Sequence, residues 1–241
     1  PLLVLLSAAL NAPAGGRGIG QRTYLAAMLV EIIHTASLIH DDVIDEADTR
    51  RGRASANAKW QSRNAVVLGD YLLARNMELG MRSGQYDLVS YVIASIATLC
   101  EGELLQSDRA ERMEITRDAY LEIIYKKTAS LLGISAGVGA LSAGANREQV
   151  ARMRRFGDAL GMAFQIQDDI LDLVSTAEVL GKPVLSDEKN EKTTYVTLKG
   201  LEKAKAEVKT LSDRAADALN SLPGDKEFLG TLIKTLVDRE K

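Results

Sequence analysis

The sequence predicts an all-α protein, folded as a single helical bundle. Only four prolines occur among 241 residues, and long stretches rich in Ala, Leu, Ile and Met alternate with short breaks. No Asn-Gly hairpin pattern separates two strand-like segments. With 46% apolar residues, a chain of this length can bury one large core. We therefore expect one domain over residues 1–241.

Apolar periodicity and break residues place the helices in order. The first helix is expected to end before the Gly-rich break that follows Asn11, and the second to run up to Glu46. The expected helices cover residues 1–10, 21–46, 64–82, 86–108, 117–144 and 147–174. The remainder from residue 195 is expected to be helical, with a turn at 222–225. Loops are expected at 50–53 and 181–194.

Composition argues against several function classes. A net charge of −3 provides no basic field for nucleic acid, and aromatic residues, at 5%, are too few for base-stacking platforms. The lone cysteine, Cys100, cannot form an internal disulfide and is expected in the core. The apolar residues 1–6 are too short to span a bilayer and lack the features of a signal peptide. We expect a cytoplasmic protein without a transmembrane segment.

Two Asp-Asp-x-x-Asp motifs lie in segments that otherwise have the pattern of apolar helices. Their carboxylates are those of Asp41, Asp42, Asp45, Asp168, Asp169 and Asp172. At about 3.6 residues per turn, the first and fifth positions share a helix face and the second lies about 100° round, so we expect the three carboxylates to converge. Each motif lies near the C-terminal end of its helix, where the helix dipole disfavours negative charge. Such clusters are costly to bury unless a cation compensates them.

The two carboxylate clusters predict a shared cation site. Oxygen ligands favour a hard cation such as Mg²⁺, which keeps several waters and bridges carboxylates to substrate phosphates. Cationic side chains suited to phosphate oxygens lie in or beside the predicted loops and helix ends, at Arg50, Arg51, Lys126, Lys127, Lys182, Lys189 and Lys192. The implied substrate is therefore a phosphate ester.

The order and spacing of these elements resemble the trans-isoprenyl diphosphate synthase family over essentially the whole chain. The matching segments flank the two motifs, and they are residues 34–40, Arg50-Arg51-Gly52, Lys127-Thr128, residues 164–167, Gly181-Lys182 and residues 192–195. The resemblance implies the all-α isoprenoid synthase fold, with a central active-site cavity. It also implies a homodimer.

The resemblance assigns roles to individual residues. The six aspartates would bind about three Mg²⁺ ions, which hold the diphosphate of an allylic substrate. His34 and Arg51 would help to hold isopentenyl diphosphate. Contacts to the allylic diphosphate or to the developing carbocation would come from Arg50 and from the catalytic candidates Lys127, Thr128, Gln165, Lys182 and Lys192.

The implied activity is head-to-tail, trans condensation of isopentenyl diphosphate with an allylic diphosphate, giving a linear polyprenyl diphosphate. This chemistry requires positioning and preorganised charge rather than a protein nucleophile. One alternative is a farnesyl or geranylgeranyl diphosphate synthase. Another is a class I terpene cyclase, whose second metal site typically mixes Asn, Ser and Glu. The last is a non-catalytic subunit of a heteromeric synthase, which typically lacks the aspartates.

Product length should be limited by the residues below Asp41 on its helix. Ser37 is one turn below Asp41, Ala36 is beside Ser37, and Ile33 lies a further turn down; each turn, about 5.4 Å, is close to one isoprene unit. Family members with short products place an aromatic residue at one of the positions that match Ala36 and Ser37. The small residues predict an open tunnel and a medium- or long-chain product, although residues 192–198 resemble farnesyl- and geranylgeranyl-type enzymes more.

Three further expectations concern the start of the chain and the polar residues near the site. Family members carry a Gly-Lys-x-x-Arg segment that ends at a proline matching Pro1, so we expect this domain to lack its N-terminal segment. His40 is expected to be structural. Gln106 and Asp108 either support the site from its edge or have no role in it, and the sequence favours neither alternative.

Overall fold

The computed structural model describes residues 1–12, 18–112, 115–174 and 193–237. It confirms the predicted all-α class, because a two-residue hairpin is the only strand pairing among the described residues. The helices are α1 (Leu2–Leu10), α2 (Gln21–Ile44), α3 (Ala56–Arg82), α4 (Tyr86–Glu111), α5 (Arg117–Ile124), α6 (Ser130–Ser142), α7 (Arg147–Val174), α10 (Tyr195–Lys199), α11 (Leu201–Asn220) and α12 (Glu227–Val237). The π-helix η1 (Tyr125–Ala129) joins α5 to α6, and β1 (Thr49–Arg50) pairs with β2 (Arg53–Ala54).

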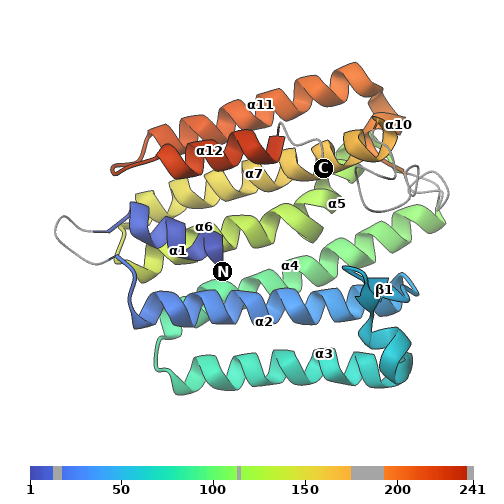
Figure 1. Cartoon of the computed structure of the whole chain (residues 1–241), viewed down its shortest axis with the longest axis horizontal. Helices are drawn as coiled ribbons and strands as arrows, with labels where there is room; N and C mark the ends of the chain where they lie inside the picture. Colours follow the sequence, from blue (N-terminus) through green and yellow to red (C-terminus); the bar gives the residue numbers. More distant parts are fainter. Residues whose placement is uncertain (13–17, 113–114, 175–192, 238–241) are drawn as a thin grey trace.

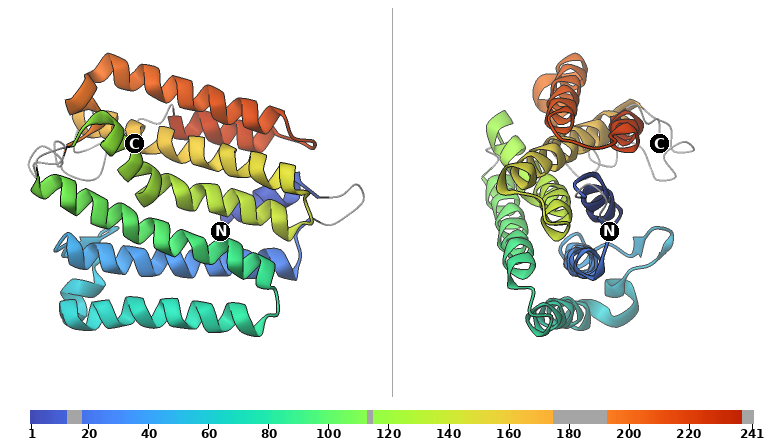
Figure 2. Two further views of the ribbon diagram at one scale, coloured as in Figure 1. Left: turned by 180° about the vertical axis from the view of Figure 1, so that it is seen from behind. Right: turned by 90° about the vertical axis from the view of Figure 1, so that its left-hand side faces the viewer.

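The long helices lie side by side, with α3 at one edge of the bundle and α11 at the other (Figure 1). Figure 2 shows α1 and α6 between the pair α2 and α3 and the pair α11 and α12, with one side of α1 facing outward. Helix α6 can lie at the centre because its glycines permit close approach. A Cβ added at Gly139 would lie 2.3 Å from the carbonyl oxygen of Val4, and one added at Gly133 would overlap the carboxylate of Asp158. The core therefore forms around a helix with very small side chains.

The described residues form core clusters that join distant parts of the chain. One cluster contains Leu10 of α1, Phe156 of α7 and Leu219 of α11, together with Leu229 and Ile233 of α12. In this cluster the apolar faces of α1, α7, α11 and α12 are buried against one another, which is where most of the stability of amphipathic helices originates. This packing connects the first and last described helices.

Three local predictions were wrong or incomplete. The segment 50–53 is a β-hairpin and not a loop, since Arg51 (φ 51°) and Gly52 (φ 73°) both adopt the positive φ of a two-residue hairpin turn. Helix α3 begins at Ala56, capped by Ser55, and contains a kink at Gln61 (φ 68°), so it starts earlier than predicted. Cys100 is exposed, because its turn of α4 borders a cavity and not the core.

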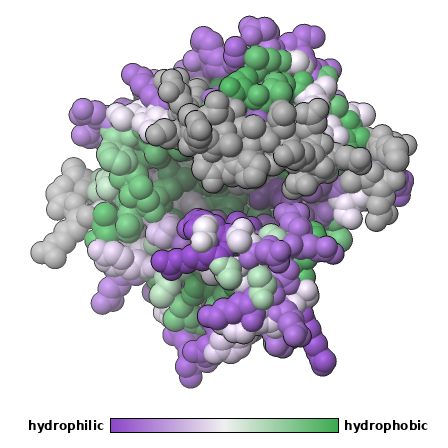
Figure 3. Space-filling view, turned by 45° about the vertical axis from the view of Figure 1, so that its right-hand side comes forward, coloured by the Kyte–Doolittle hydropathy of each residue, from purple (hydrophilic) through white to green (hydrophobic). Residues whose placement is uncertain are grey.

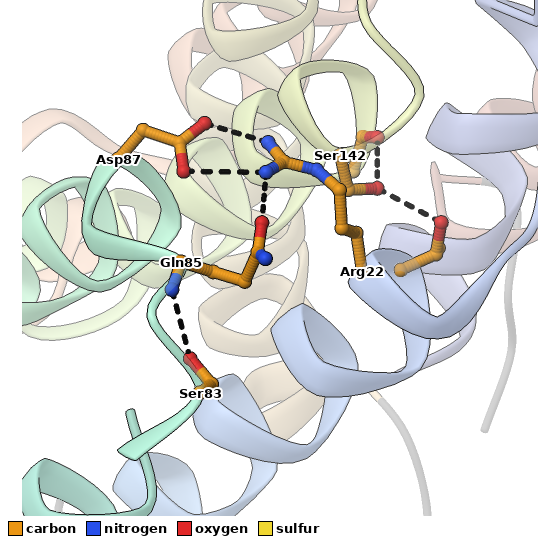
Figure 4. A network of polar contacts seen from close by, with 7 residues as sticks. Arg22, Ser83, Gln85, Asp87 and Ser142 are labelled. Atoms are coloured by element: carbon orange, nitrogen blue, oxygen red, sulfur yellow. Dashed lines mark hydrogen bonds and ion pairs between the residues drawn. The ribbon is translucent and has the colours of Figure 1, made fainter. Parts of the chain in front are cut away.

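A polar network joins the first turn of α2 to the start of α4 (Figure 4). The Arg22 guanidinium lies 2.6 Å from Asp87 Oδ2 and also donates to Gln85 Oε1. Ser142, at the end of α6, donates to Thr23 Oγ1 at 3.0 Å. These contacts hold together the end of the bundle that lies away from the aspartate motifs.

Two helices, α2 and the Tyr86–Arg109 part of α4, have the length and apolar composition that a membrane span requires. Composition gives only weak support for insertion, because core helices meet the same criterion. Both helices contribute to the core here, through Leu29 and Ile33 of α2 and Leu88 and Val92 of α4. This packing buries 39% of the apolar window in α2 and 28% of that in α4.

Candidate active site

The two aspartate motifs lie at the same end of the bundle. Helices α2 and α7 run in the same direction, and both C-terminal ends lie at the right-hand end in Figure 1. Figure 3 shows this end from the outside, with a hollow between the upper and lower parts of the molecule. The two motif helices therefore end on the same side of the bundle.

In the first motif, Asp42 is held by the hairpin that follows the helix. Arg50, in β1, places Nε and Nη2 each 2.7 Å from Asp42 Oδ1. The Asp42 side chain is only 4% exposed, so this ion pair is shielded from solvent on one side. Charge-assisted hydrogen bonds of this kind are strong and directional. They fix the Arg50 guanidinium beside the motif.

Asp41 borders a cavity of about 420 Å³ between α2, α3 and α4. Apolar residues such as Leu99 and Leu104 form part of its wall, and Lys127 lies at it as well. Burial raises the pKa of Asp41 to about 6; Glu103 and Asp45 add to the rise, and Lys127 and Arg50 oppose it. A divalent cation beside this carboxylate would favour its ionised form, so the position suits a metal ligand.

The π-helix η1 presents two of the predicted catalytic residues. Lys127 Nζ lies 2.5 Å from Glu103 Oε1 and donates to Gln106 Oε1 at 3.2 Å. Thr128 Oγ1 donates to Gln165 Oε1 of α7 at 3.3 Å. Short π-helices are often found at functional sites. The described structure thus brings Lys127, Thr128 and Gln165 together next to the motifs.

The second motif also contains one carboxylate held by protein donors. Asp169 Oδ2 accepts hydrogen bonds from the Tyr120 hydroxyl of α5 and from the Tyr195 backbone amide, the latter at 2.8 Å. Asp172 is buried, and Asp168 is half-buried. The second position of each motif therefore has a different environment from the first.

Among the described residues, no group of three or more His, Cys, Asp or Glu side chains is close enough to hold a metal ion. The expectation that all three carboxylates of a motif converge therefore does not hold there, because Asp42 and Asp169 turn toward Arg50 and toward Tyr120 and Tyr195. The donor chemistry still fits Mg²⁺, which is usually bound through one or two carboxylates, substrate phosphates and water.

The remaining predicted site residues are placed as follows. His34 is partly exposed, with Nδ1 3.7 Å from Glu31 Oε2, and Arg51 is exposed at the hairpin turn. Ser37 lines the cavity beside Asp41, whereas Ala36 and Ile33 are fully enclosed. Lys182 and Lys192 lie outside the described residues.

His40 contacts helix α3 and also lines the cavity beside Asp41, and its structural role stays a prediction. Its Nε2 lies 3.2 Å from the Val66 carbonyl oxygen and 3.4 Å from Asp70 Oδ1, both in α3. A Cβ at Gly69 would overlap the His40 ring, so α2 and α3 approach closely here. The His40 imidazole occupies the space between α2 and α3 at Gly69.

Sequence reasoning missed Glu103, Tyr120 and Tyr195 as residues of the site. Glu103 lies three residues before Gln106, whose role was left open, and Tyr195 closes the matching segment 192–195. Nothing in the spacing of Tyr120 indicates a contact with Asp169, because the two residues meet only through folding.

Comparison with known proteins gives one consistent family. The polyprenyl synthetase family matches residues 1–227. The short chain isoprenyl diphosphate synthase of Methanothermobacter thermautotrophicus is 39% identical over 208 residues, which are 85% of this chain and 62% of that protein. Component 2 of the heptaprenyl diphosphate synthase of Geobacillus stearothermophilus is 43% identical over 187 residues, 78% of this chain and 57% of that protein.

The fold comparison agrees with the sequence comparison. The crystal structure of a decaprenyl diphosphate synthase from Rhodobacter capsulatus superposes with a TM-score of 0.89 at 33% identity, covering 100% of this chain and 85% of that one. The chain spans about three-fifths of the length of the curated relatives it matches. On the family match over residues 1–227 and the shared fold, the chain belongs to the polyprenyl synthetase family.

Proposed function

We propose that this protein is a Mg²⁺-dependent trans-prenyltransferase that condenses isopentenyl diphosphate with an allylic diphosphate. The observation that carries this proposal is the position of two aspartate motifs at one end of the bundle, with Arg50 and Lys127 beside Asp41 and Asp42. Carboxylates and fixed cations in this arrangement suit a substrate that carries a diphosphate. Residues 1–241 would act as one catalytic domain.

The proposed mechanism assigns a task to each part of the site. Asp41, Asp45, Asp168 and Asp172, with Asp42 and Asp169 beside them, would hold about three Mg²⁺ ions together with the allylic diphosphate. The bound ions would neutralise the leaving diphosphate. Arg50 and Lys127, and in family terms Lys182 and Lys192, would donate to its oxygens.

The remaining residues would position the second substrate and the cation. His34 and Arg51 would hold isopentenyl diphosphate, so that its double bond attacks the allylic carbon. Thr128 and Gln165, hydrogen-bonded to each other at 3.3 Å, would direct their dipoles toward the developing positive charge. A proton is then lost to the released diphosphate, and no protein nucleophile is needed.

The product is proposed to be of medium or long chain, with a geranylgeranyl-type product as the alternative. Ser37 is the member of the predicted tunnel trio that lines the described cavity, while Ala36 and Ile33 are enclosed in the bundle. A Ser37→Tyr variant should therefore shorten the product. Ala36→Tyr should do the same where the growing isoprenoid tail passes the side of α2 that carries Ala36. An unchanged product ladder in both variants would refute the proposed tunnel floor.

The activity is tested with the purified protein alone, Mg²⁺, radiolabelled isopentenyl diphosphate and farnesyl diphosphate. A linear polyprenol after dephosphorylation supports the proposal. A cyclised hydrocarbon would indicate a terpene cyclase, and no product would indicate a subunit that requires a partner. Asp168→Ala should abolish condensation without unfolding the protein, and full activity in this variant would overturn the assignment.

A homodimer is proposed, with the outer face of α3 as its contact surface. Val67, Tyr71 and Met81 are each more than half exposed on this helix, and such apolar patches mark interaction sites. A heteromeric partner is the second candidate, because the Geobacillus relative is one component of its synthase. Light scattering after gel filtration distinguishes a dimer of this chain from a monomer that needs a partner. We also propose a cytoplasmic location.

A further inference from the structure

A pocket between α5, α10 and α11 carries more positive than negative charge. It has a volume of about 340 Å³ and lies at the end of the bundle where α10 contacts both α5 and α11 (Figure 1). Each helix contributes a cation, since Arg117 lies in α5, Lys199 in α10 and Lys203 in α11. Glu207 is the only acidic side chain among the described residues that line the pocket. Three cations and one carboxylate leave the pocket with a formal charge of +2.

Tyr195 forms the buried part of the pocket wall. It is 3% exposed, and its ring packs edge to face against that of Tyr120, with the centroids 6.1 Å apart. The Tyr195 hydroxyl accepts a hydrogen bond from Arg117 Nε at 3.3 Å and donates one to Glu207 Oε2 at 3.2 Å. Groups from α10 and α11 therefore set the position of the Arg117 guanidinium.

Arg117 can donate to an anion without giving up these contacts. Its contacts to Tyr195, Asp118 and Glu207 are 3.2 to 3.4 Å long. Charge-assisted hydrogen bonds are typically shorter, at ~2.7–2.9 Å. A guanidinium carries more N–H donors than these contacts use, and its planar fork matches two oxygens of a phosphate. Arg117 is therefore suited to hold an oxyanion in the pocket.

Lys199 and Lys203 line the pocket from its exposed side. Neither lysine forms an ion pair within the part of the chain that the structure describes. Lys209, further along α11, is also exposed but pairs with Asp213 at 2.7 Å. An unpaired lysine gives up no ion pair when it contacts a ligand, so Lys199 and Lys203 are both available to an anion.

The size and the charge of the pocket favour a small dianion. Ligand pockets span roughly 300–1,000 Å³, so a volume of about 340 Å³ suits a small ligand rather than one with an isoprenoid tail. A phosphate group carries a charge of about −1.5 to −2 at neutral pH, which complements the pocket, whereas a carboxylate carries a single charge. A phosphate that keeps one proton can donate it to the Glu207 carboxylate.

We propose that this pocket binds a small phosphate anion, with inorganic phosphate as the simplest ligand, between Arg117, Lys199 and Lys203. The bound anion connects α5, α10 and α11. Helix α10 has five residues, far fewer than the ~12–15 that an isolated helix needs, so its position depends on tertiary contacts that the anion adds to. The inference does not rest on the proposed function, because the aspartate motifs do not line this pocket.

Binding is tested by titrating isotope-labelled protein with inorganic phosphate and following the amide resonances of α10 by NMR. EDTA is present throughout, so that no divalent cation brings phosphate to the aspartate motifs. We expect a Kd on the order of 1 mM. Lys199→Ala and Lys203→Ala should each weaken binding about threefold, and the double variant about tenfold, since exposed ion pairs contribute little singly. The matched control, Lys209→Ala, should keep the wild-type Kd.

Glu207→Gln should change the affinity in the opposite direction. The variant removes the negative charge from the pocket, while its amide oxygen still accepts the hydrogen bond from the Tyr195 hydroxyl. We expect it to bind phosphate about threefold more tightly than the wild type. A residue with a purely structural role would not raise the affinity when its charge is removed.

Hydrogen exchange reports whether the anion stabilises α10. The Leu198 amide donates to the Thr194 carbonyl oxygen at 3.1 Å, within this helix. Where opening of α10 releases the ligand, phosphate at about ten times its Kd should slow exchange of this amide about tenfold. The same phosphate concentration should have little effect in the Lys199→Ala/Lys203→Ala double variant.

Three results would overturn the proposal. The first is a wild-type protein whose α10 resonances do not respond to phosphate. The second is an equal loss of affinity in Lys209→Ala and Lys203→Ala, which would indicate general attraction to a charged surface. The third is binding to vesicles of phosphatidylcholine and phosphatidic acid without binding of free phosphate, which would indicate a site for a lipid headgroup.

Discussion

Gly102 offers a direct test of whether the π-helix positions the catalytic residues. It lies in α4 against η1, and a Cβ added there would be 2.9 Å from Lys126 Cβ and 2.9 Å from the backbone nitrogen of Lys127. Comfortable carbon contacts begin near ~3.5 Å, so the Gly102→Ala variant must separate α4 and η1 by roughly 0.5 Å or more. The backbone on both sides has to move, because one of the two atoms belongs to the main chain.

The expected effect on stability is modest and the effect on activity is large. Overpacking typically costs about 1–3 kcal/mol, and the better helix propensity of alanine offsets up to about 1 kcal/mol of this. Lys127 and Thr128 lie directly in the displaced segment, in contact with Glu103 and Gln165. A misplacement of about 1 Å in such groups can lower kcat by about 100-fold, so a shift of roughly 0.5 Å is expected to lower it by about tenfold.

The measurement combines prenyl transfer with urea unfolding of the same preparations. The control is Gly230→Ala in α12, where an added Cβ meets nothing within 4 Å. This control should gain up to about 1 kcal/mol of stability and keep its kcat. If Gly102→Ala folds and retains full kcat, the π-helix does not set the position of Lys127.

The remaining predictions concern stability and charge. Burial raises the pKa of Asp158 to about 6 from 3.8, against the opposing effect of Arg154. Because the pKa of Asp158 is higher in the folded state than in the unfolded state, the stability that it contributes is greatest below pH ~4 and is lost as the pH rises through ~6. The urea midpoint of the wild type should therefore fall over this range, and that of Asp158→Asn should not. The same pH profile in both proteins would contradict the raised pKa of Asp158. Gly69→Ala should lower the melting temperature by several degrees, since the new Cβ overlaps the His40 ring, and an unchanged melting temperature would show that the imidazole moves away freely. Arg50→Lys should weaken binding of inorganic pyrophosphate about tenfold, because one ammonium group cannot make both contacts to Asp42 and also face a diphosphate. Equal affinity in the variant would show that the orientation of the Arg50 guanidinium does not matter for pyrophosphate binding.

Helix positions followed closely from the sequence, whereas their irregularities did not. Apolar periodicity and Gly- or Pro-containing breaks located α2 and α7 to within about two residues at each end. The π-helix within the predicted 117–144 helix was not foreseen; it lies against Gly102 of α4. The hairpin at Arg50 was missed for a related reason: its turn uses an arginine at positive φ, which is uncommon.

The sequence indicates candidate residues for the site but not the contacts that these residues make. Spacing along a helix decides which side chains share a face, so the sequence alone indicated two carboxylate motifs and the cations near them. Of the three residues expected along the product tunnel, Ser37 lines the cavity beside Asp41, whereas Ala36 and Ile33 are enclosed in the bundle.

What only the tertiary structure decided is which partner each carboxylate meets. Asp42 and Arg50 are close in sequence, yet they pair only because the hairpin turns back toward α2. Asp169 receives its hydrogen bonds from Tyr120 and Tyr195, which lie 49 and 26 residues away along the chain. Helical periodicity is a local property that sequence spacing fixes, whereas contacts between segments form only when the bundle packs.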